Sequence, residues 1–154
     1  MNQLQRALDI TRTSRKLHLK ILNTLNLEQL NIVPNGFRNS LFWNFAHIVV
    51  TQQLLVYRLS DSAVNVSEKW IELYKKGTVF TEAAREEDLS LLKKLLLETI
   101  DNTEIDLQND RLKPITPYAT STGYELKNLE DVFQFINFHE GIHFGYILAM
   151  KKAL

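Results

Sequence analysis

Apolar residues recur at three- and four-residue steps along four long segments of the chain. This spacing places their side chains on one face of an α-helix. In the first segment, about residues 3–25, the positions that share a face are Leu4, Leu8, Thr11, Ser14, His18, Leu22 and Leu25. Similar patterns predict three more helices, over about Ser40–Ser60, Glu86–Leu107 and Asn128–Lys151. Each helix of about 20 residues would be about 30 Å long.

Two long connections separate these segments. Residues 61–85 contain a short helical pattern from Ser67 to Lys76, and residues 110–127 are expected to form an irregular loop because they contain Pro114, Pro117 and Gly123. Loops of this length inside a compact domain are often functional, for example as pocket walls. We therefore predict an all-α fold, a single four-helix-bundle domain over residues 1–154 with long crossover connections.

The charge balance narrows the range of partners. The chain has 18 basic and 18 acidic residues, interspersed, so it lacks the basic excess that is typical of nucleic-acid binding. It has no cysteine, which excludes disulfides and a thiol nucleophile of its own. Residues 1–20 lack the apolar run of a secretory signal, and no segment is apolar enough to span a bilayer. We expect a soluble, cytoplasmic protein without nucleic-acid or membrane partners.

Two of the four histidines, His139 and His143, stand four residues apart in the last predicted helix. Residues at this spacing share a helix face, with Cβ atoms about 5–6 Å apart, close enough for two imidazoles to bind one metal ion. Both lie near the centre of an apolar stripe and are expected to point into the bundle. The stripe consists of Leu129, Val132, Phe135, Ile136, His139, Ile142, His143, Tyr146, Ile147 and Met150.

His47 lies in the strongly apolar second helix, and in a bundle it could meet His139 and His143 across the core. Three histidine ligands leave coordination positions open for water or substrate, as in catalytic metal sites. The simpler alternative is that each histidine is a core residue with a nearby hydrogen-bond partner. Imidazole ligands suit Zn, Ni, Fe and Cu alike, so the residues do not select the metal.

Residues 139–143 also match H-E-x-x-H, the signature of zinc proteases. Such enzymes take a third ligand from further along the chain, and no His, Glu or Asp follows His143. The motif therefore does not indicate a protease. Glu140 itself is interpreted as a solvated helix residue. The two alternatives are a residue that orients a metal ligand without binding the ion, or a general base.

Two further residues are candidates for the same site. His18 lies on the apolar face of the first helix, where it is expected to be a core or pocket-lining residue rather than a fourth ligand. Arg58 lies on the His47 face of the second helix. It could bind an anionic group of a substrate, but an arginine that extends to solvent from the helix end is the simpler interpretation.

Several motifs resemble the DinB-like superfamily, which also contains the YfiT-like proteins. Leu27–Leu30, followed by Pro34 and Gly36, precede the second helix as in many members. Trp43–Ile48 (WNFAHI) is similar to the family's histidine-bearing motif on that helix, and Phe138–Ile147 (FHEGIHFGYI) is similar to its H-x-x-x-H motif on the last helix. The resemblance runs along essentially the whole chain.

This resemblance implies a four-helix bundle with a site for one divalent ion, nickel or zinc, held by His47, His139 and His143. Some members of the superfamily are thiol S-transferases that use bacillithiol, mycothiol or glutathione. It thus implies a metal-dependent transferase or hydrolase that acts on a small electrophilic molecule, with a low-molecular-weight thiol as co-substrate. The alternative is a non-catalytic, stress-response protein that binds a metal or a small molecule.

The second predicted helix has another apolar stripe opposite His47, formed by Phe42, Phe45, Val49 and Val56. A helix that is apolar on both faces needs cover on both. Either the 61–85 connection or a second subunit could supply it. We predict a homodimer.

Overall fold

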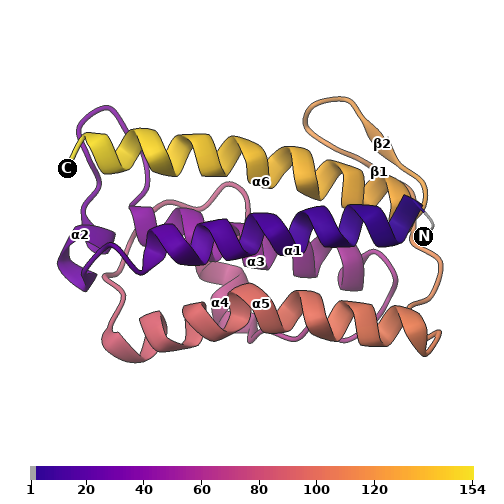
Figure 1. Cartoon of the computed structure of the whole chain (residues 1–154). Helices are drawn as coiled ribbons and strands as arrows, with labels where there is room; N and C mark the ends of the chain where they lie inside the picture. Colours follow the sequence, from indigo (N-terminus) through magenta and orange to yellow (C-terminus); the bar gives the residue numbers. More distant parts are fainter. Residues whose placement is uncertain (1–2) are drawn as a thin grey trace.

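The computed structural model describes residues 3–154, and its longest helices pack as a bundle (Figure 1). They are α1 (Gln3–Leu22), α3 (Leu41–Gln53), α5 (Glu86–Gln108) and α6 (Leu129–Lys152). Helix α1 packs against α5 and α6, and α3 packs against the same two helices from the other side. The expected all-α four-helix bundle is confirmed. The expected domain, 1–154, includes Met1 and Asn2, which lie outside the described residues.

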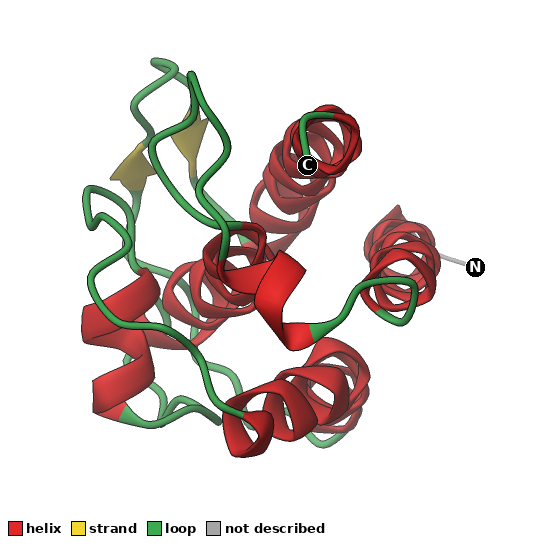
Figure 2. Cartoon of the chain, turned by 90° about the vertical axis from the view of Figure 1, so that its left-hand side faces the viewer, coloured by secondary structure: helices red, strands yellow, loops and turns green. Residues whose placement is uncertain are grey.

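The shorter elements lie mostly on the outer side of α3 (Figure 2). They are α2 (Leu27–Asn31), the π-helical turn η1 (Leu54–Arg58), α4 (Glu68–Tyr74), β1 (Tyr118–Ala119) and β2 (Glu125–Leu126). The short helix expected within residues 67–76 is therefore present as α4. Because η1 continues α3 directly, the expected second helix reaches Arg58, but its last turn is wider than an α-helix, a feature that is frequent at functional sites.

The prediction of a wholly irregular loop over residues 110–127 is wrong. Within it, β1 and β2 pair antiparallel, with Tyr118 opposite Leu126. The connecting turn is closed by the Gly123 N–H, which donates to the carbonyl of Thr120 over 3.0 Å. Gly123 adopts a φ of 85°, which glycine takes without steric cost. Strands of two residues are too short to show an alternating pattern, so the sequence carries no signal for them.

Both helices that carry the candidate ligands begin at a capping side chain. Ser40 Oγ accepts from the Trp43 N–H at 3.1 Å, and Asn128 Oδ1 accepts from the Asp131 N–H at 2.9 Å. Asp131 in turn accepts from the N–H of Lys127, at 2.9 Å, rather than from that of Asn128. These caps satisfy backbone donors that have no partner within the helix.

The second apolar stripe of α3 is covered within the chain. Phe42 is buried against α4, with its ring centroid 6.3 Å from that of Trp70 and 5.8 Å from that of Tyr74. The other members, Phe45 and Val49 in α3 and Val56 in η1, are also buried. The connection between α3 and α5 thus covers Phe42, one of the two alternatives that the sequence left open, and the ring of Phe45 packs against His18 of α1. The homodimer stays a prediction, but this stripe no longer supports it.

The face of α6 that enters the bundle differs from the expected stripe. Ile142 and Tyr146 are 52% and 41% exposed, whereas Glu140 is 0% exposed. His139 and His143 are half-buried on the flank that meets α3, rather than at the centre of the buried face. The stripe was misplaced because a charged residue counts against burial in a hydrophobic pattern, and here the charged residue is the one that points inward.

An ion pair inside the bundle explains the burial of Glu140. Arg15 of α1 donates from Nε to Glu140 Oε1 at 2.8 Å, and both side chains are fully buried. Its other nitrogens donate to the carbonyl of Leu96 in α5, at 3.3 Å, and to that of Ile48 in α3, at 3.0 Å. One residue of α1 is thereby bonded to the three other long helices.

The interpretation of Glu140 as a solvated helix residue is wrong. Burial raises the pKa of its carboxyl group, and the neighbouring Arg15 opposes this rise. A buried guanidinium needs a negative counter-ion inside the bundle. Glu140 is therefore the partner that allows Arg15 to be buried.

Removal of one partner of this pair should destabilise the protein strongly, since the other charge is left buried without compensation. We expect Arg15→Met and Glu140→Gln each to lower the free energy of unfolding by about 3–5 kcal/mol. The double variant should lose clearly less than the sum of the two single losses. Urea denaturation followed by circular dichroism measures this.

The control is Lys94→Met, which removes the exposed Lys94–Glu98 pair of α5 and should change stability by no more than about 0.5 kcal/mol. If the losses of the two single variants simply add in the double variant, Arg15 and Glu140 do not act as a pair.

Candidate metal centre

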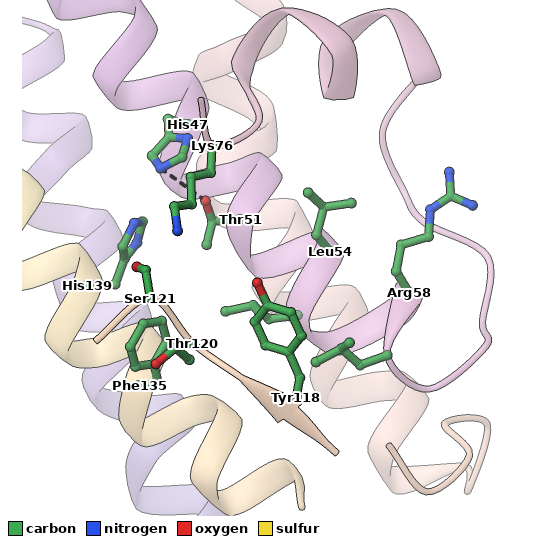
Figure 3. Close-up of a pocket in the computed structure, with 12 residues that line it drawn as sticks. His47, Thr51, Leu54, Arg58, Lys76, Tyr118, Thr120, Ser121, Phe135 and His139 are labelled. Atoms are coloured by element: carbon green, nitrogen blue, oxygen red, sulfur yellow. Dashed lines mark hydrogen bonds between the residues drawn. The ribbon is translucent and has the colours of Figure 1, made fainter. Parts of the chain in front are cut away.

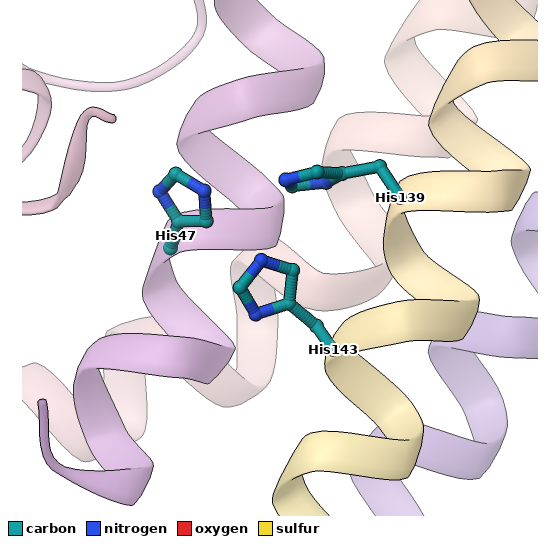
Figure 4. A group of neighbouring side chains, drawn as sticks. All are labelled: His47, His139 and His143. Atoms are coloured by element: carbon teal, nitrogen blue, oxygen red, sulfur yellow. The ribbon is translucent and has the colours of Figure 1, made fainter. Parts of the chain in front are cut away.

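The structure brings together the three histidines that the sequence singled out. His47 projects from α3, and His139 and His143 project toward it from successive turns of α6 (Figure 4). One ring nitrogen of each lies within 4.8 Å of the corresponding nitrogens of the other two. The ring centroids are 4.6–5.1 Å apart. The packing of α3 against α6 therefore decides the point that the sequence left open, namely that His47 meets the other two histidines.

The ring of His47 is held from behind by α4. Its Nδ1–H donates to the carbonyl of Tyr74, at 2.6 Å, and Trp43 stacks on its face with the centroids 4.5 Å apart. A carbonyl only accepts, so Nδ1 carries the proton and Nε2 keeps its lone pair. The hydroxyl of Thr51 lies 3.3 Å from this Nε2. The nitrogen that is available to a ligand therefore faces α6 and the space beside it.

The ring of His143 is oriented in the same way by Asn44. The amide Nδ2 of Asn44 donates to the carbonyl of Ser40 at 2.9 Å, which leaves its Oδ1 to accept from His143 Nδ1 at 2.9 Å. His143 therefore also carries its proton on Nδ1 and presents the lone pair of Nε2. Metal-bound histidines characteristically donate their second N–H to an oxygen of the protein in this manner.

All three imidazoles are neutral at physiological pH. Burial, with a smaller effect of the neighbouring histidines, lowers the pKa of His139 to about 2 and that of His143 to about 3. Burial also lowers the pKa of His47, against the effect of its hydrogen bond to Tyr74. Neutral imidazole is the form that binds a metal ion, so no proton has to be displaced.

The residues fit a divalent ion. Three neutral nitrogen donors suit Zn, Ni, Fe or Cu. An ion at about 2.1 Å from each nitrogen needs the nitrogens about 3.4 Å apart in tetrahedral geometry, and because they now lie within 4.8 Å of one another, the side chains would have to approach by about 1.4 Å at most. The hydrogen bonds that His47 and His143 donate to Tyr74 and Asn44 use Nδ1, so Nε2 keeps its lone pair on two of the three rings.

A cavity of about 370 Å³ adjoins the cluster on the side of His47 and His139 (Figure 3). Part of its wall comes from the 110–127 segment, as expected for a loop of that length. Of the residues that the structure describes, those lining the cavity include two cations and no carboxylate. The lining residues are His47, Thr51, Leu54, Leu55, Arg58, Leu59, Lys76, Tyr118, Thr120, Ser121, Phe135 and His139.

His18 is a core residue, in agreement with the expectation. It is fully buried, its Nδ1 donates to the carbonyl of Ser14 at 2.9 Å, and the rings of Phe45 and Phe144 pack edge-on against it. It does not belong to the cluster formed by the other three histidines. Burial lowers its pKa to about 4.

Arg58 lines the far part of the cavity, and its exposed guanidinium pairs with Glu68 at the start of α4. The expected extension to solvent is therefore correct. Sequence reasoning missed Asn44, although its position three residues before His47 places the two on neighbouring parts of one helix face. It also missed the Tyr74 carbonyl and Lys76, for which no local pattern exists because both come from the crossover.

The fold and the cluster together define an all-α bundle whose neighbouring helices α3 and α6 bring three histidines to the wall of a cavity. The DinB superfamily model matches residues 10–147, a range that includes all three histidines, and the chain belongs to this superfamily. No curated protein shows significant similarity to the chain. Within residues 3–154, no helix is both long and apolar enough to cross a membrane.

The metal-free protein should lose stability in mild acid. The pKa of His18 is about 4 in the folded state and about 6.5 in an unfolded chain, so between these values the unfolded state binds more protons and acid favours it. His18→Leu should reduce the loss of unfolding free energy between pH 7 and pH 5 by about 2 kcal/mol. Denaturant titrations at both pH values, with a chelator present, measure the unfolding free energy of wild type and variant.

Leu22→Ala is the matched control, because it also disturbs the buried face of α1 but leaves every histidine in place. It should lower stability equally at pH 7 and pH 5. A wild-type pH dependence in His18→Leu would show that His18 is not buried in its neutral form.

Proposed function

We propose that this protein is a metal-dependent enzyme in which His47, His139 and His143 hold one divalent ion, nickel or zinc, and a low-molecular-weight thiol attacks a small electrophilic molecule. The observation that carries the proposal is the convergence of three neutral imidazoles at the wall of a cavity. His47 and His139 line this cavity, whereas His143 does not. A ligand in the cavity therefore meets the cluster on the side of those two rings.

The described lining of the cavity offers no carboxylate as a base, so the nucleophile would have to ionise on the metal ion. Among the described residues that line it, no Asp or Glu can serve as general base, and the carboxylate of Glu140 is directed at Arg15 instead. When bound, a divalent ion lowers the pKa of a coordinating thiol far enough that no protein base is needed. A water bound to the same ion would be activated in the same way, and hydrolysis is the closest variant of the proposed reaction.

The remaining lining residues position the reactants. The hydroxyl of Thr51, next to His47 Nε2, can donate to a polar group bound at the cluster. Thr120 and Ser121 bring two more hydroxyls from the connection that contains β1 and β2. Leu54 and Phe135 supply apolar surface that excludes water from the reacting groups.

Metal content is the direct test. We expect about one ion per chain in the wild-type protein by inductively coupled plasma mass spectrometry, and its loss in His47→Ala and His139→Ala. The control His18→Leu should keep the ion, because His18 lies outside the cluster. Absence of metal from wild type, even after nickel and zinc are supplied, would refute the proposal.

The same variants separate an enzyme from a binding protein. Thiol consumption with 1-chloro-2,4-dinitrobenzene, assayed with glutathione, bacillithiol and mycothiol, should be accelerated by wild type and not by His47→Ala. If the protein binds the ion but does not accelerate thiol consumption with this or any other electrophile, a non-catalytic role of the site is favoured.

Asn44 should contribute to metal affinity without touching the ion. Asn44→Ala removes the acceptor that orients His143, and we expect a 10- to 100-fold weaker metal affinity in competition with a chromophoric chelator. Asn137→Ala is the matched control, since Asn137 also links two helices, through Thr11 and Ala7, but contacts none of the three histidines. Equal affinities in both variants would mean that His143 needs no orientation by Asn44.

A further inference from the structure

The charge of the cavity has one sign. Among the described lining residues, Arg58 and Lys76 are cations and none is an anion, and a divalent ion at the histidines would add to this charge. Both cations are exposed, and charge of one sign on the wall of a cavity favours a ligand of the opposite sign. The two cations are not equivalent, however, in what they already bind.

Lys76 is the cation that is available. Arg58 is paired with Glu68, and its guanidinium points away from the cavity (Figure 3). The neighbour of Lys76, Lys75, is paired with Glu72 at 2.7 Å. For the ammonium of Lys76, in contrast, there is no hydrogen bond or ion pair to any residue in the range 3–154.

The backbone that carries Lys76 is held in place from two sides. Two residues before it, the Tyr74 carbonyl accepts from His47, and two residues after it, the Thr78 hydroxyl donates to the carbonyl of Leu73 at 2.9 Å and accepts from the indole of Trp43 at 3.1 Å. The side chain extends from this anchored turn into the part of the cavity that His47 and Thr51 also line (Figure 3). Its charge is therefore directed at the histidine end.

Beyond the hydroxyls of Thr120 and Ser121 and the stem of Arg58, the rest of the cavity wall is apolar. Leu54, Leu55, Leu59, Phe135 and the ring of Tyr118 form most of the wall away from Lys76. The volume of about 370 Å³ lies at the small end of the range for small-molecule sites, about 300–1,000 Å³. A ligand that matches this surface has one negative group at the histidine end and an apolar chain or ring beyond it.

We propose that the cavity binds a small carboxylate with an apolar chain or ring, and that Lys76 pairs with its carboxylate group. The inference deepens the proposed function, because this anion would be one of the two reactants, either the electrophile or the thiol. It concerns the ligand and not the ion, so the two can be tested separately.

The test compares 4-phenylbutanoate with its neutral analogue 4-phenylbutanamide. Isothermal titration of the purified chain, after treatment with a chelator and again with zinc restored, gives both affinities. In the chelated wild-type protein we expect the carboxylate to bind about five- to tenfold more tightly than the amide. Lys76→Met should reduce this ratio to about one with little change for the amide, and Lys76→Arg should retain most of it.

Lys75→Met is the matched control, since it removes an adjacent lysine that does not line the cavity, and it should keep the wild-type ratio. The proposal is overturned if chelated wild type binds neither compound or does not prefer the carboxylate. It is equally overturned if the preference survives in Lys76→Met, or if Arg58→Met abolishes it while Lys76→Met does not.

Competition with glutathione, a thiol that itself carries carboxylates, identifies the source of the anion. Displacement of 4-phenylbutanoate supports a role of Lys76 in binding the thiol, and simultaneous binding supports a role in binding the electrophile. Metal content measured on the same samples keeps the two proposals distinct. A Lys76-dependent preference in a protein that never binds metal would refute the proposed enzyme and leave the anion site in place.

Discussion

The buried ion pair between Arg15 and Glu140 is the interaction on which the arrangement of the bundle depends. A guanidinium inside a protein must find acceptors for its donors and a counter-charge, and Arg15 finds them on all three of the other long helices. Two of these contacts fall next to candidate ligands, at Ile48 beside His47 and at Glu140 beside His139. The pair that joins the helices therefore also sets α3 and α6 at the separation that lets the histidines meet.

The orientation of the histidine rings depends on a second group of contacts, outside the bundle core. The Tyr74 carbonyl at the end of α4 holds His47, and the Asn44 amide, itself held by Ser40, orients His143. Helix α4 thus has two roles: it covers Phe42 on the outer face of α3, and it directs one imidazole toward α6. The crossover is part of the site and not only a connection.

The separation of charges between core and cavity has a chemical consequence. Glu140 neutralises Arg15 inside the bundle and is directed away from the cavity, so the described lining contains cations and hydroxyls but no carboxylate. A site of this kind does not offer a protein base, and it suits a reactant that ionises on a metal ion and a ligand that carries its own negative charge. The proposed thiol chemistry and the proposed carboxylate site both follow from this one distribution of charge.

The sequence by itself determined the elements whose signals are local. Apolar residues at helical spacing located α1, α3, α5 and α6, and the four-residue step from His139 to His143 placed two imidazoles together, because the 3.6-residue turn of the helix is a property of the backbone. Only the tertiary structure decided which way each helix turns its faces. It directed Glu140 rather than Ile142 inward, brought His47 across to α6, and placed Lys76 of the crossover at the cavity. These outcomes depend on partners distant in sequence, such as Arg15 for Glu140, and a hydrophobic pattern cannot reveal that a charged residue will find its counter-ion in the core.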